Sequence, residues 1–213
     1  GYTLEHMPED TLLVVMSDHG FSPWRRAFHL NTWLKEDGYL TLKEPDKTGE
    51  YYSNVDWTKT RAYGLGINGL YLNLKGRERG GTVDPEDRDG MIAEIAGRLR
   101  RVIDPETGEP AISKVYIREE TYTDGSYLHI GPDIQVGYAR GTRGSDESAI
   151  GEILPEVLTD NMDRWSGDHC MDHESVPGIL LTSRPLQKEA TELKNLAAAI
   201  LAEYGLEYPP RAE

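Results

Sequence analysis

The sequence holds a single cysteine, Cys170, among its 213 residues. One cysteine excludes an intramolecular disulfide framework, so the fold has to be stabilised by its core. Proteins without disulfides are the rule in reducing compartments. We therefore expect a cytoplasmic protein.

Long apolar runs and positive charge are also scarce. No run approaches the roughly 18 to 20 apolar residues that a membrane-spanning helix needs. The opening residues, GYTLEHMPEDT, are charged and contain a proline, unlike a signal peptide. Lys and Arg number 23 against 37 Asp and Glu, which gives a net charge of -14. Because such a surface repels phosphate backbones, we expect no nucleic-acid duplex as a partner. Because no apolar run is long enough to span a bilayer, we expect no membrane as a partner either.

The chain begins without a methionine, and residues 1–7 have the pattern of the last turns of a helix before Pro8. We interpret this as a protein that continues on the N-terminal side. A processed natural terminus is the alternative.

The apolar pattern predicts strands that alternate with helices, which favours an α/β layered domain. Residues 11–16, TLLVVM, have the continuous apolar character of a strand buried on both faces. The other predicted strands are 39–43, two within 61–74, 112–117, 133–138 and 176–183. The predicted helices are 28–37, 87–102 and 188–204, and the predicted loops are 44–60, 75–84, 118–132 and 139–152.

Ser17-Asp18-His19-Gly20 directly follows the first predicted strand. Ligands of open α/β sheets bind at the carboxyl ends of strands. A carboxylate oxygen and an imidazole nitrogen together suit Zn or Mn. The alternative is a turn in which Asp18 caps the next segment and His19 is exposed.

A second cluster of potential ligands runs from Gly167 to His173, GDHCMDH. Its two histidines have H-x-x-x-H spacing, but Cys170 stands where a zincin protease has glutamate, and a protease is disfavoured. Cys170 as a nucleophile with a histidine base is a second alternative. A lone cysteine more often packs as a small apolar residue.

Several weaker candidates accompany these clusters. His29 either approaches the site or is an ordinary surface or capping histidine, and we favour the latter. Asp172 and His173 either orient His169 or lie in a solvated loop. Three arginines can bind phosphate by bidentate hydrogen bonds: Arg61, Arg140 and Arg143. We expect them instead to be solvated surface residues.

The two clusters occur in a characteristic order, S-D-H-G after a buried strand and then G-D-H followed by V-P-G-I-L-L. Further stretches of the same kind are HLNTWL (29–34), GYL (38–40), YLNLKGRE (71–78), PDI (132–134) and WSGDH (165–169). From Thr11 to Arg184 the chain resembles the alkaline phosphatase superfamily. The resemblance is to its type I phosphodiesterase/nucleotide pyrophosphatase branch, especially the predicted phosphohydrolase/phosphomutase group.

This resemblance implies a three-layer α/β/α sandwich truncated at its N-terminal side. Residues 1–213 would be a single C-terminal portion of that domain, with 44–150 as a cap or insertion. The family site holds two divalent ions, Zn or Mn, and acts on small-molecule phosphate esters. The matching positions imply that Asp18 and His19 bind one ion and that His169 binds the other.

The chain departs from the family pattern before Ser17. The first aspartate, the Thr or Ser nucleophile and the D-x-x-x-H element precede this point in the family, and 16 residues are too few to hold them. We therefore expect no catalytic nucleophile in this chain and no turnover by the chain alone. A truncated sheet leaves an unpaired edge, which predicts dimerisation or limited solubility. The alternative function is a non-catalytic metal- or phosphate-binding domain.

Overall fold

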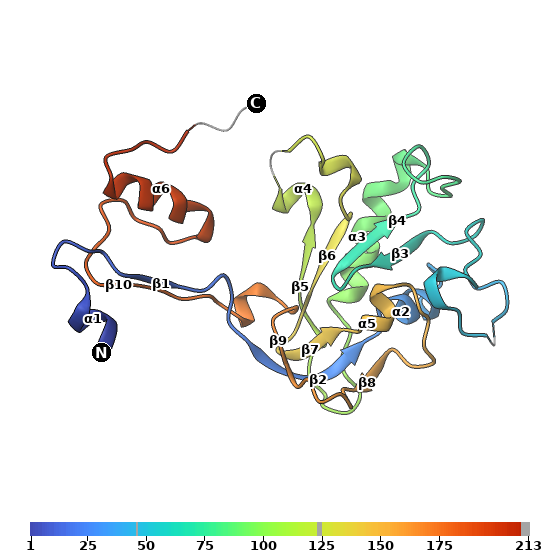
Figure 1. Ribbon diagram of the computed structural model, residues 1–213. Helices are drawn as coiled ribbons and strands as arrows, with labels where there is room; N and C mark the ends of the chain where they lie inside the picture. Colours follow the sequence, from blue (N-terminus) through green and yellow to red (C-terminus); the bar gives the residue numbers. More distant parts are fainter. Residues whose placement is uncertain (46, 123–124, 210–213) are drawn as a thin grey trace. The chain divides into compact units, whose positions relative to one another are not determined.

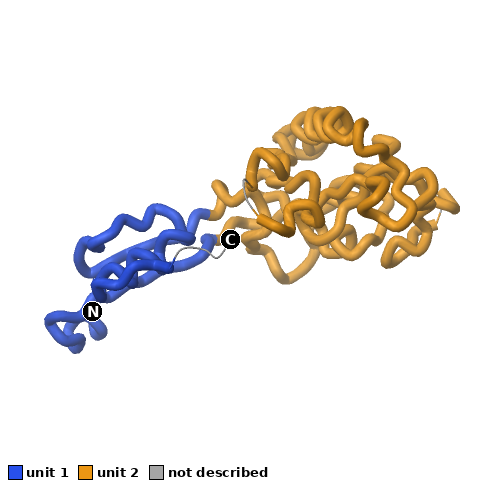
Figure 2. Tube along the Cα trace, turned by 90° about the horizontal axis from the view of Figure 1, so that it is seen from above, with its two compact units in different colours: residues 1–20, 177–213 blue, residues 21–176 orange. Residues whose placement is uncertain are grey.

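The computed structural model describes residues 1–45, 47–122 and 125–209. The chain forms two compact units, one of residues 1–20 and 177–213 and the other of residues 21–176 (Figure 2). We call them unit 1 and unit 2. Among the described residues, no helix is long and apolar enough to cross a membrane.

The described part of unit 1 contains two strands and two helices, which Figure 1 labels. Its elements are α1 (Tyr2–His6), β1 (Val14–Met16), β10 (Leu180–Thr182) and α6 (Leu193–Glu203). β1 and β10 pair antiparallel, with Val15 opposite Leu181. The strands predicted at 11–16 and 176–183 and the helix predicted at 188–204 are confirmed with shorter bounds. Gly205 follows α6 with a φ of 67°, the left-handed conformation that commonly ends a helix.

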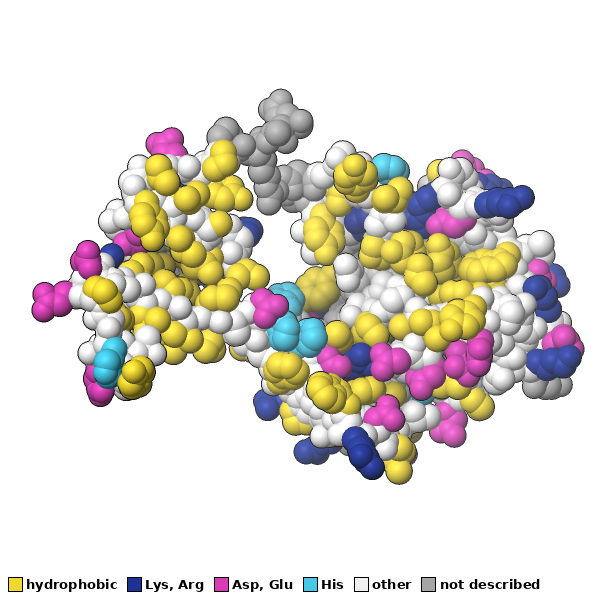
Figure 3. Space-filling model, in the orientation of Figure 1, with side chains coloured by type: hydrophobic (Ala, Val, Ile, Leu, Met, Phe, Trp, Pro, Cys, Tyr) yellow, Lys and Arg dark blue, Asp and Glu magenta, His cyan; other side chains and the backbone are white. Residues whose placement is uncertain are grey.

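The prediction that the first strand is buried on both faces is wrong. Val15 is 46% exposed and Met16 41% exposed. Within the described residues β1 pairs with β10 alone, and a two-stranded ribbon covers little of its own apolar surface. Leu181 and Leu193 of unit 1 are also exposed. Figure 3 shows in yellow the apolar side chains on one face of the molecule, among them several of unit 1.

One sheet of unit 2 has four antiparallel strands in the order β3-β4-β6-β5 (Figure 1). Its strands are β3 (Ala62–Leu65), β4 (Gly69–Leu72), β5 (Ile112–Ile117) and β6 (Ile134–Tyr138). Helix α3 (Arg88–Leu99) contributes its buried stripe of Ile92, Ile95, Ala96 and Leu99 to the core. The sequence predictions for these four strands and this helix are confirmed, with bounds that differ by a few residues.

The second sheet of unit 2 is built around β2 (Ser22–Phe28). β2 pairs parallel with β7 (Gly141–Gly144) and antiparallel with β8 (Leu158–Asp160) and β9 (Gly167–Asp168). Sequence reasoning missed these strands and placed 139–152 in a loop. The reason is visible in β2, SPWRRAF, where Arg26 is buried because it pairs with Asp104. A buried arginine hides the alternation that identifies a strand.

Helix α2 (Leu30–Glu36) follows β2 and confirms the helix predicted at 28–37, although Phe28 belongs to the strand. The strand predicted at 39–43 does not form, apart from a single antiparallel bridge between Leu42 and Val55. The backbone N–H groups of Tyr39 and Leu40 both donate to the carbonyl of Leu34, at 2.8 and 3.0 Å. These residues therefore close the end of α2 and leave no N–H for a ladder.

Several short helical turns lie in the remaining chain of unit 2. They are η1 (Glu50–Tyr52), η2 (Pro85–Asp87), α4 (Arg118–Thr121), η3 (Leu128–Ile130), α5 (Asp146–Ala149) and η4 (His173–Ser175). Several of them lie inside the segments predicted as loops. Asp46 and residues 123–124, which belong to two of these predicted loops, lie outside the described residues.

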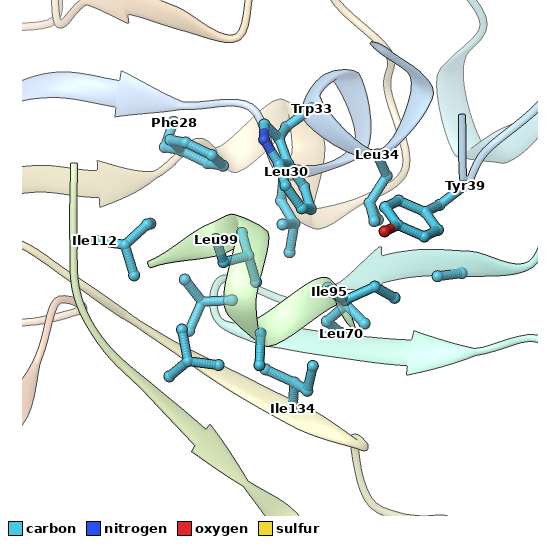
Figure 4. Packing of buried hydrophobic residues seen from close by; sticks show 14 of the residues in the cluster. Phe28, Leu30, Trp33, Leu34, Tyr39, Leu70, Ile95, Leu99, Ile112 and Ile134 are labelled. Atoms are coloured by element: carbon cyan, nitrogen blue, oxygen red, sulfur yellow. The ribbon is translucent and has the colours of Figure 1, made fainter. Parts of the chain in front are cut away.

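The core of unit 2 lies between α2, α3 and the four-stranded sheet (Figure 4). Leu34, Leu70, Ile95, Leu99 and Ile134 are completely buried there. Each buried aliphatic side chain stabilises the fold by about 1.5–3 kcal/mol relative to exposure. This packed body carries β9 with Asp168 and the following His169.

The mixed α/β class expected from the sequence is confirmed. The specific three-layer α/β/α sandwich and its truncation remain predictions. The interpretation of residues 1–213 as one portion of such a domain, with 44–150 as a cap or insertion, also remains a prediction.

Candidate metal centre

Asp18 and His19 follow β1 in unit 1, and their side chains turn toward one another. His19 Nε2 lies 3.7 Å from Asp18 Oδ2. On the other side of the ring, His19 Nδ1 lies 2.9 Å from the carbonyl oxygen of Gly20. That carbonyl can only accept, so it holds the proton on Nδ1 and leaves the lone pair on Nε2. The dipeptide therefore offers one imidazole nitrogen and one carboxylate oxygen side by side.

This spacing fits two ligands of one metal ion. Two atoms that share a tetrahedral ion at about 2.0–2.2 Å lie roughly 3.3–3.6 Å apart. The observed 3.7 Å between Nε2 and Oδ2 needs only a small side-chain adjustment. The Asp18 side chain is 68% exposed, so a hydrated ion can reach it. The alternative in which Asp18 caps the next segment is realised in part, because Asp18 Oδ1 accepts the N–H of His19 at 3.1 Å.

His169 follows β9 in unit 2, next to the buried Asp168. Asp168 Oδ1 accepts the backbone N–H groups of His169 and Cys170 at 2.6 and 3.0 Å. The same oxygen lies 3.3 Å from His169 Nδ1. Phe21 packs edge-on against the imidazole, with ring centroids 5.8 Å apart. The ring is thus held by contacts on its Nδ1 side and on its face.

Asp168 is held in turn by Arg143 of β7. Arg143 Nε lies 2.8 Å from Asp168 Oδ2, an ion-pair distance, although the N–H direction does not meet a directed hydrogen bond. Burial by itself would raise the pKa of Asp168. The N–H groups of Cys170 and His169 and the charge of Arg143 outweigh it and hold the pKa below its ordinary value. Asp168 is therefore a carboxylate at neutral pH.

Cys170 completes a group of three potential metal donors. One ligand atom each from Asp168, His169 and Cys170 lie within 4.8 Å of one another. The Cys170 sulfur is 3.8 Å from His169 Nε2. Burial and the carboxylate of Asp168 raise the pKa of the thiol above its ordinary value. A raised pKa lowers the thiolate fraction, which argues against Cys170 as a nucleophile.

His29 is not the surface residue that we expected. It is 2% exposed and stands at the N-cap position of α2 without a side-chain capping bond. Its Nδ1 contacts the hydroxyl of Ser145 at 2.7 Å, and its Nε2 contacts the hydroxyl of Thr159 at 2.9 Å. Both ring nitrogens are satisfied inside the second sheet. Burial lowers the pKa of His29.

Asp172 and its neighbour His173 differ in burial. Asp172 is buried, and its carboxylate accepts hydrogen bonds from the hydroxyls of Ser113 at 2.9 Å and Tyr116 at 3.1 Å. The solvated-loop interpretation is therefore wrong for Asp172. It is right for His173, whose side chain is exposed and contacts the Tyr116 hydroxyl.

The three candidate phosphate-binding arginines also differ. Arg61 and Arg140 are exposed, as expected. Arg143 is buried, packs over the ring of Trp24 at 4.4 Å and pairs with Asp168, so the surface interpretation is wrong for it. Sequence reasoning missed the role of Asp168. The available signal was its position beside His169, since a carboxylate next to a metal-binding histidine commonly orients it.

Asp18 and His19 belong to unit 1, and His169 belongs to unit 2. Their meeting in one two-metal site remains a prediction. The donor types fit such a site, because carboxylate oxygens and imidazole nitrogens bind both Zn and Mn.

Comparison with known proteins shows the family. No match was found to a curated protein or to a solved structure. The model of the family described as type I phosphodiesterase / nucleotide pyrophosphatase matches residues 1–153. This match includes Asp18 and His19 and ends before His169. Since it covers more than half of the chain, the protein belongs to the type I phosphodiesterase/nucleotide pyrophosphatase family.

Proposed function

We propose that this chain supplies metal ligands to a two-metal phosphoester hydrolase. Asp18 and His19 hold one divalent ion and His169 holds the other. The observation that carries the proposal is the pairing of His19 Nε2 with Asp18 Oδ2 at 3.7 Å, with His19 Nδ1 on the Gly20 carbonyl. Family membership supports phosphate-ester hydrolysis as the reaction.

The ions are Zn or Mn, because the donor set suits both. When bound, two such ions supply Lewis acidity to the attacking and leaving oxygens of a phosphoryl transfer. In this proposal the residues of this chain bind the ions and orient the metal-binding histidines. Asp18 contributes negative charge, Gly20 sets the tautomer of His19, and Asp168 lies against the Nδ1 side of His169.

A complete two-metal site of this kind also needs a hydroxyl nucleophile, a further aspartate and a D-x-x-x-H element, and we assign none of these to residues 1–213. Residues 1–213 then bind metal weakly and do not turn over substrate. The substrate is a small-molecule phosphate ester.

The test compares residues 1–213 with the longest product that the gene encodes. Both are assayed for hydrolysis of an aryl phosphate monoester and an aryl phosphate diester in the presence of Zn²⁺ or Mn²⁺. We expect turnover from the longer protein alone. Asp18→Asn, His19→Gln and His169→Gln in that protein should each lower the rate at least about a hundredfold, because several kcal/mol of charge stabilisation are lost. His6→Gln, at an exposed histidine of unit 1, is the matched control and should leave the rate unchanged.

Turnover by residues 1–213, free of contaminants and lost on chelation, would contradict the proposed incompleteness. Metal binding by the longer protein without hydrolysis of either ester would favour the non-catalytic metal- or phosphate-binding domain. The cytoplasmic location and the homodimer expected from the sequence remain predictions. Sedimentation velocity at several protein concentrations tests the homodimer.

A further inference from the structure

Asp168 contacts the backbone of His169, its ring and the backbone of the following residue. Its Oδ1 accepts the backbone N–H of His169 at 2.6 Å and lies 3.3 Å from Nδ1 of the same residue. It also accepts the N–H of Cys170 at 3.0 Å, which fixes the chain on the other side of His169. One carboxylate oxygen thus fixes both the backbone and the ring of the candidate ligand.

A carboxylate that faces Nδ1 selects the tautomer of the imidazole. The 3.3 Å contact between Asp168 Oδ1 and His169 Nδ1 is an ion-pair distance and not a directed hydrogen bond. An ionised carboxylate can only accept, so its negative charge beside Nδ1 favours the proton on that nitrogen. The lone pair is then on Nε2, the nitrogen on the far side of the ring. A histidine arranged in this way presents Nε2 as its metal-binding atom.

The surroundings of Asp168 make this carboxylate rigid. Asp168 lies in β9, paired with Ser22 of β2, and is 6% exposed. Arg143 reaches it from β7, with Nε 2.8 Å from Oδ2. The guanidinium of Arg143 lies over the indole of Trp24, which is itself buried. A buried carboxylate costs much free energy unless a cation accompanies it, and Arg143 fulfils that condition.

We propose that Asp168 is a positioning residue that holds His169 in the Nδ1–H tautomer with Nε2 directed to metal. The inference rests on the proposed role of His169 as a ligand. His19 shows the same arrangement by a different means, because the carbonyl of Gly20 lies 2.9 Å from its Nδ1. A backbone carbonyl cannot be removed by substitution, whereas Asp168 can. His169 is therefore the histidine at which the principle can be tested.

The first measurement is the tautomer of His169 in the metal-free chain, by long-range ¹H–¹⁵N NMR of ¹⁵N-histidine-labelled protein at pH 8. His169→Gln identifies the resonances of His169 among the six histidines. We expect the Nδ1–H tautomer in the wild type and a loss of that preference in Asp168→Asn. The double variant Asp168→Asn/Arg143→Met should give the same loss without leaving the buried Arg143 with only its exposed partner Asp146.

Asp172→Asn is the matched control. It makes the same chemical change at another buried carboxylate in the same segment, one that accepts from Ser113 and Tyr116. We expect the His169 tautomer to be unchanged in this variant. A general loosening of the segment would instead alter His169 in both variants, and that outcome would overturn the positioning role.

The second measurement is a Zn²⁺ titration followed at the His169 resonances. Removing a carboxylate that orients a metal-binding histidine typically weakens metal binding by about 10- to 100-fold. We expect the apparent Kd at His169 to rise by about that factor in Asp168→Asn and to stay constant in Asp172→Asn.

The two measurements separate the inference from the proposed function. If Zn²⁺ leaves the His169 resonances of the wild type unchanged, the ligand role of His169 fails, while the tautomer result still decides the effect of Asp168. If Zn²⁺ perturbs His169 equally in the wild type and in Asp168→Asn, the positioning role fails and the ligand role stands. An Nε2–H tautomer in the metal-free wild type would overturn the inference directly.

Discussion

Arg77 and Asp133 form a buried ion pair in which Nη2 of the arginine lies 2.7 Å from Oδ2 of the aspartate. Asp133 is completely buried directly before β6 and also accepts the backbone N–H of Leu72 at 2.9 Å. Arg88 reaches the other carboxylate oxygen at 3.0 Å. The carboxylate therefore connects β6, β4 and the N-terminus of α3.

Asp133→Ala should lower the free energy of unfolding by about 3–5 kcal/mol, because it leaves buried cationic groups without their partner. Urea denaturation followed by circular dichroism measures this value. Asp89→Ala is the control, because Asp89 also pairs with Arg88 but from a side chain that is 90% exposed. An exposed pair contributes about 1 kcal/mol or less. Equal effects of the two substitutions would show that the Asp133 network does not stabilise the fold.

His29 should make the stability of unit 2 depend on pH. Burial lowers its pKa in the folded state below the ordinary 6.5. The unfolded chain therefore binds a proton more readily, and the folded state is favoured at pH values above 6.5. Stability should decrease as the pH falls from 6.5 through the lower folded-state pKa, and His29→Gln should reduce that dependence. Urea denaturation at pH 5.0, 6.0 and 7.5 measures it, with the exposed His129→Gln as control.

Leu99 tests the core that supports the second candidate ligand. It is completely buried at the end of α3, among the residues of the core cluster. Leu99→Ala should lower the free energy of unfolding by about 2–5 kcal/mol, since it removes buried methyl groups and leaves a cavity. Leu65→Ala is the matched control, because Leu65 in β3 is 48% exposed and its loss should cost about 0.5 kcal/mol. A similar cost for both would place the core elsewhere.

Metal binding to unit 1 should depend on Asp18 and His19. Calorimetric titration of residues 1–213 with Zn²⁺ should show weak binding that is reduced at least about tenfold in Asp18→Ala and in His19→Ala, because each change removes one ligand atom. His6→Ala, whose imidazole contacts the carbonyl of Tyr2 within the same unit, is the control. Unchanged binding in both ligand variants would refute the assignment of this pair.

The sequence pattern predicted secondary structure correctly where an element is determined by residues close together in the sequence. The stripe of α3 has apolar residues at helical spacing, and Ile95 and Leu99 are buried as that spacing predicts. The β3–β4 hairpin likewise followed from short apolar runs around glycine, and Gly66 adopts a φ of 72° in its turn. Such features are local, so the sequence alone contains them.

The sequence pattern predicted burial wrongly where residues distant in the sequence decide whether a side chain is buried. Arg26 and Arg143 are of a residue type that is usually exposed, yet both are buried, because Asp104 and Asp168 neutralise them from other segments of the chain. Conversely, the apolar β1 is partly exposed because its only strand neighbour within the described residues is β10. Burial depends on which segments meet, and that information is not local.

By itself, then, the sequence determined the family, the mixed α/β class and the candidate ligands Asp18, His19 and His169, because these follow from residue types in a fixed order. The tertiary structure alone decided how those ligands are presented. It placed Gly20 and Asp168 on the Nδ1 side of His19 and His169, and it brought Arg143 from β7 to Asp168. The orientation of an imidazole depends on which acceptor faces which nitrogen, and only the folded chain brings β7 and β9 together with β2 between them.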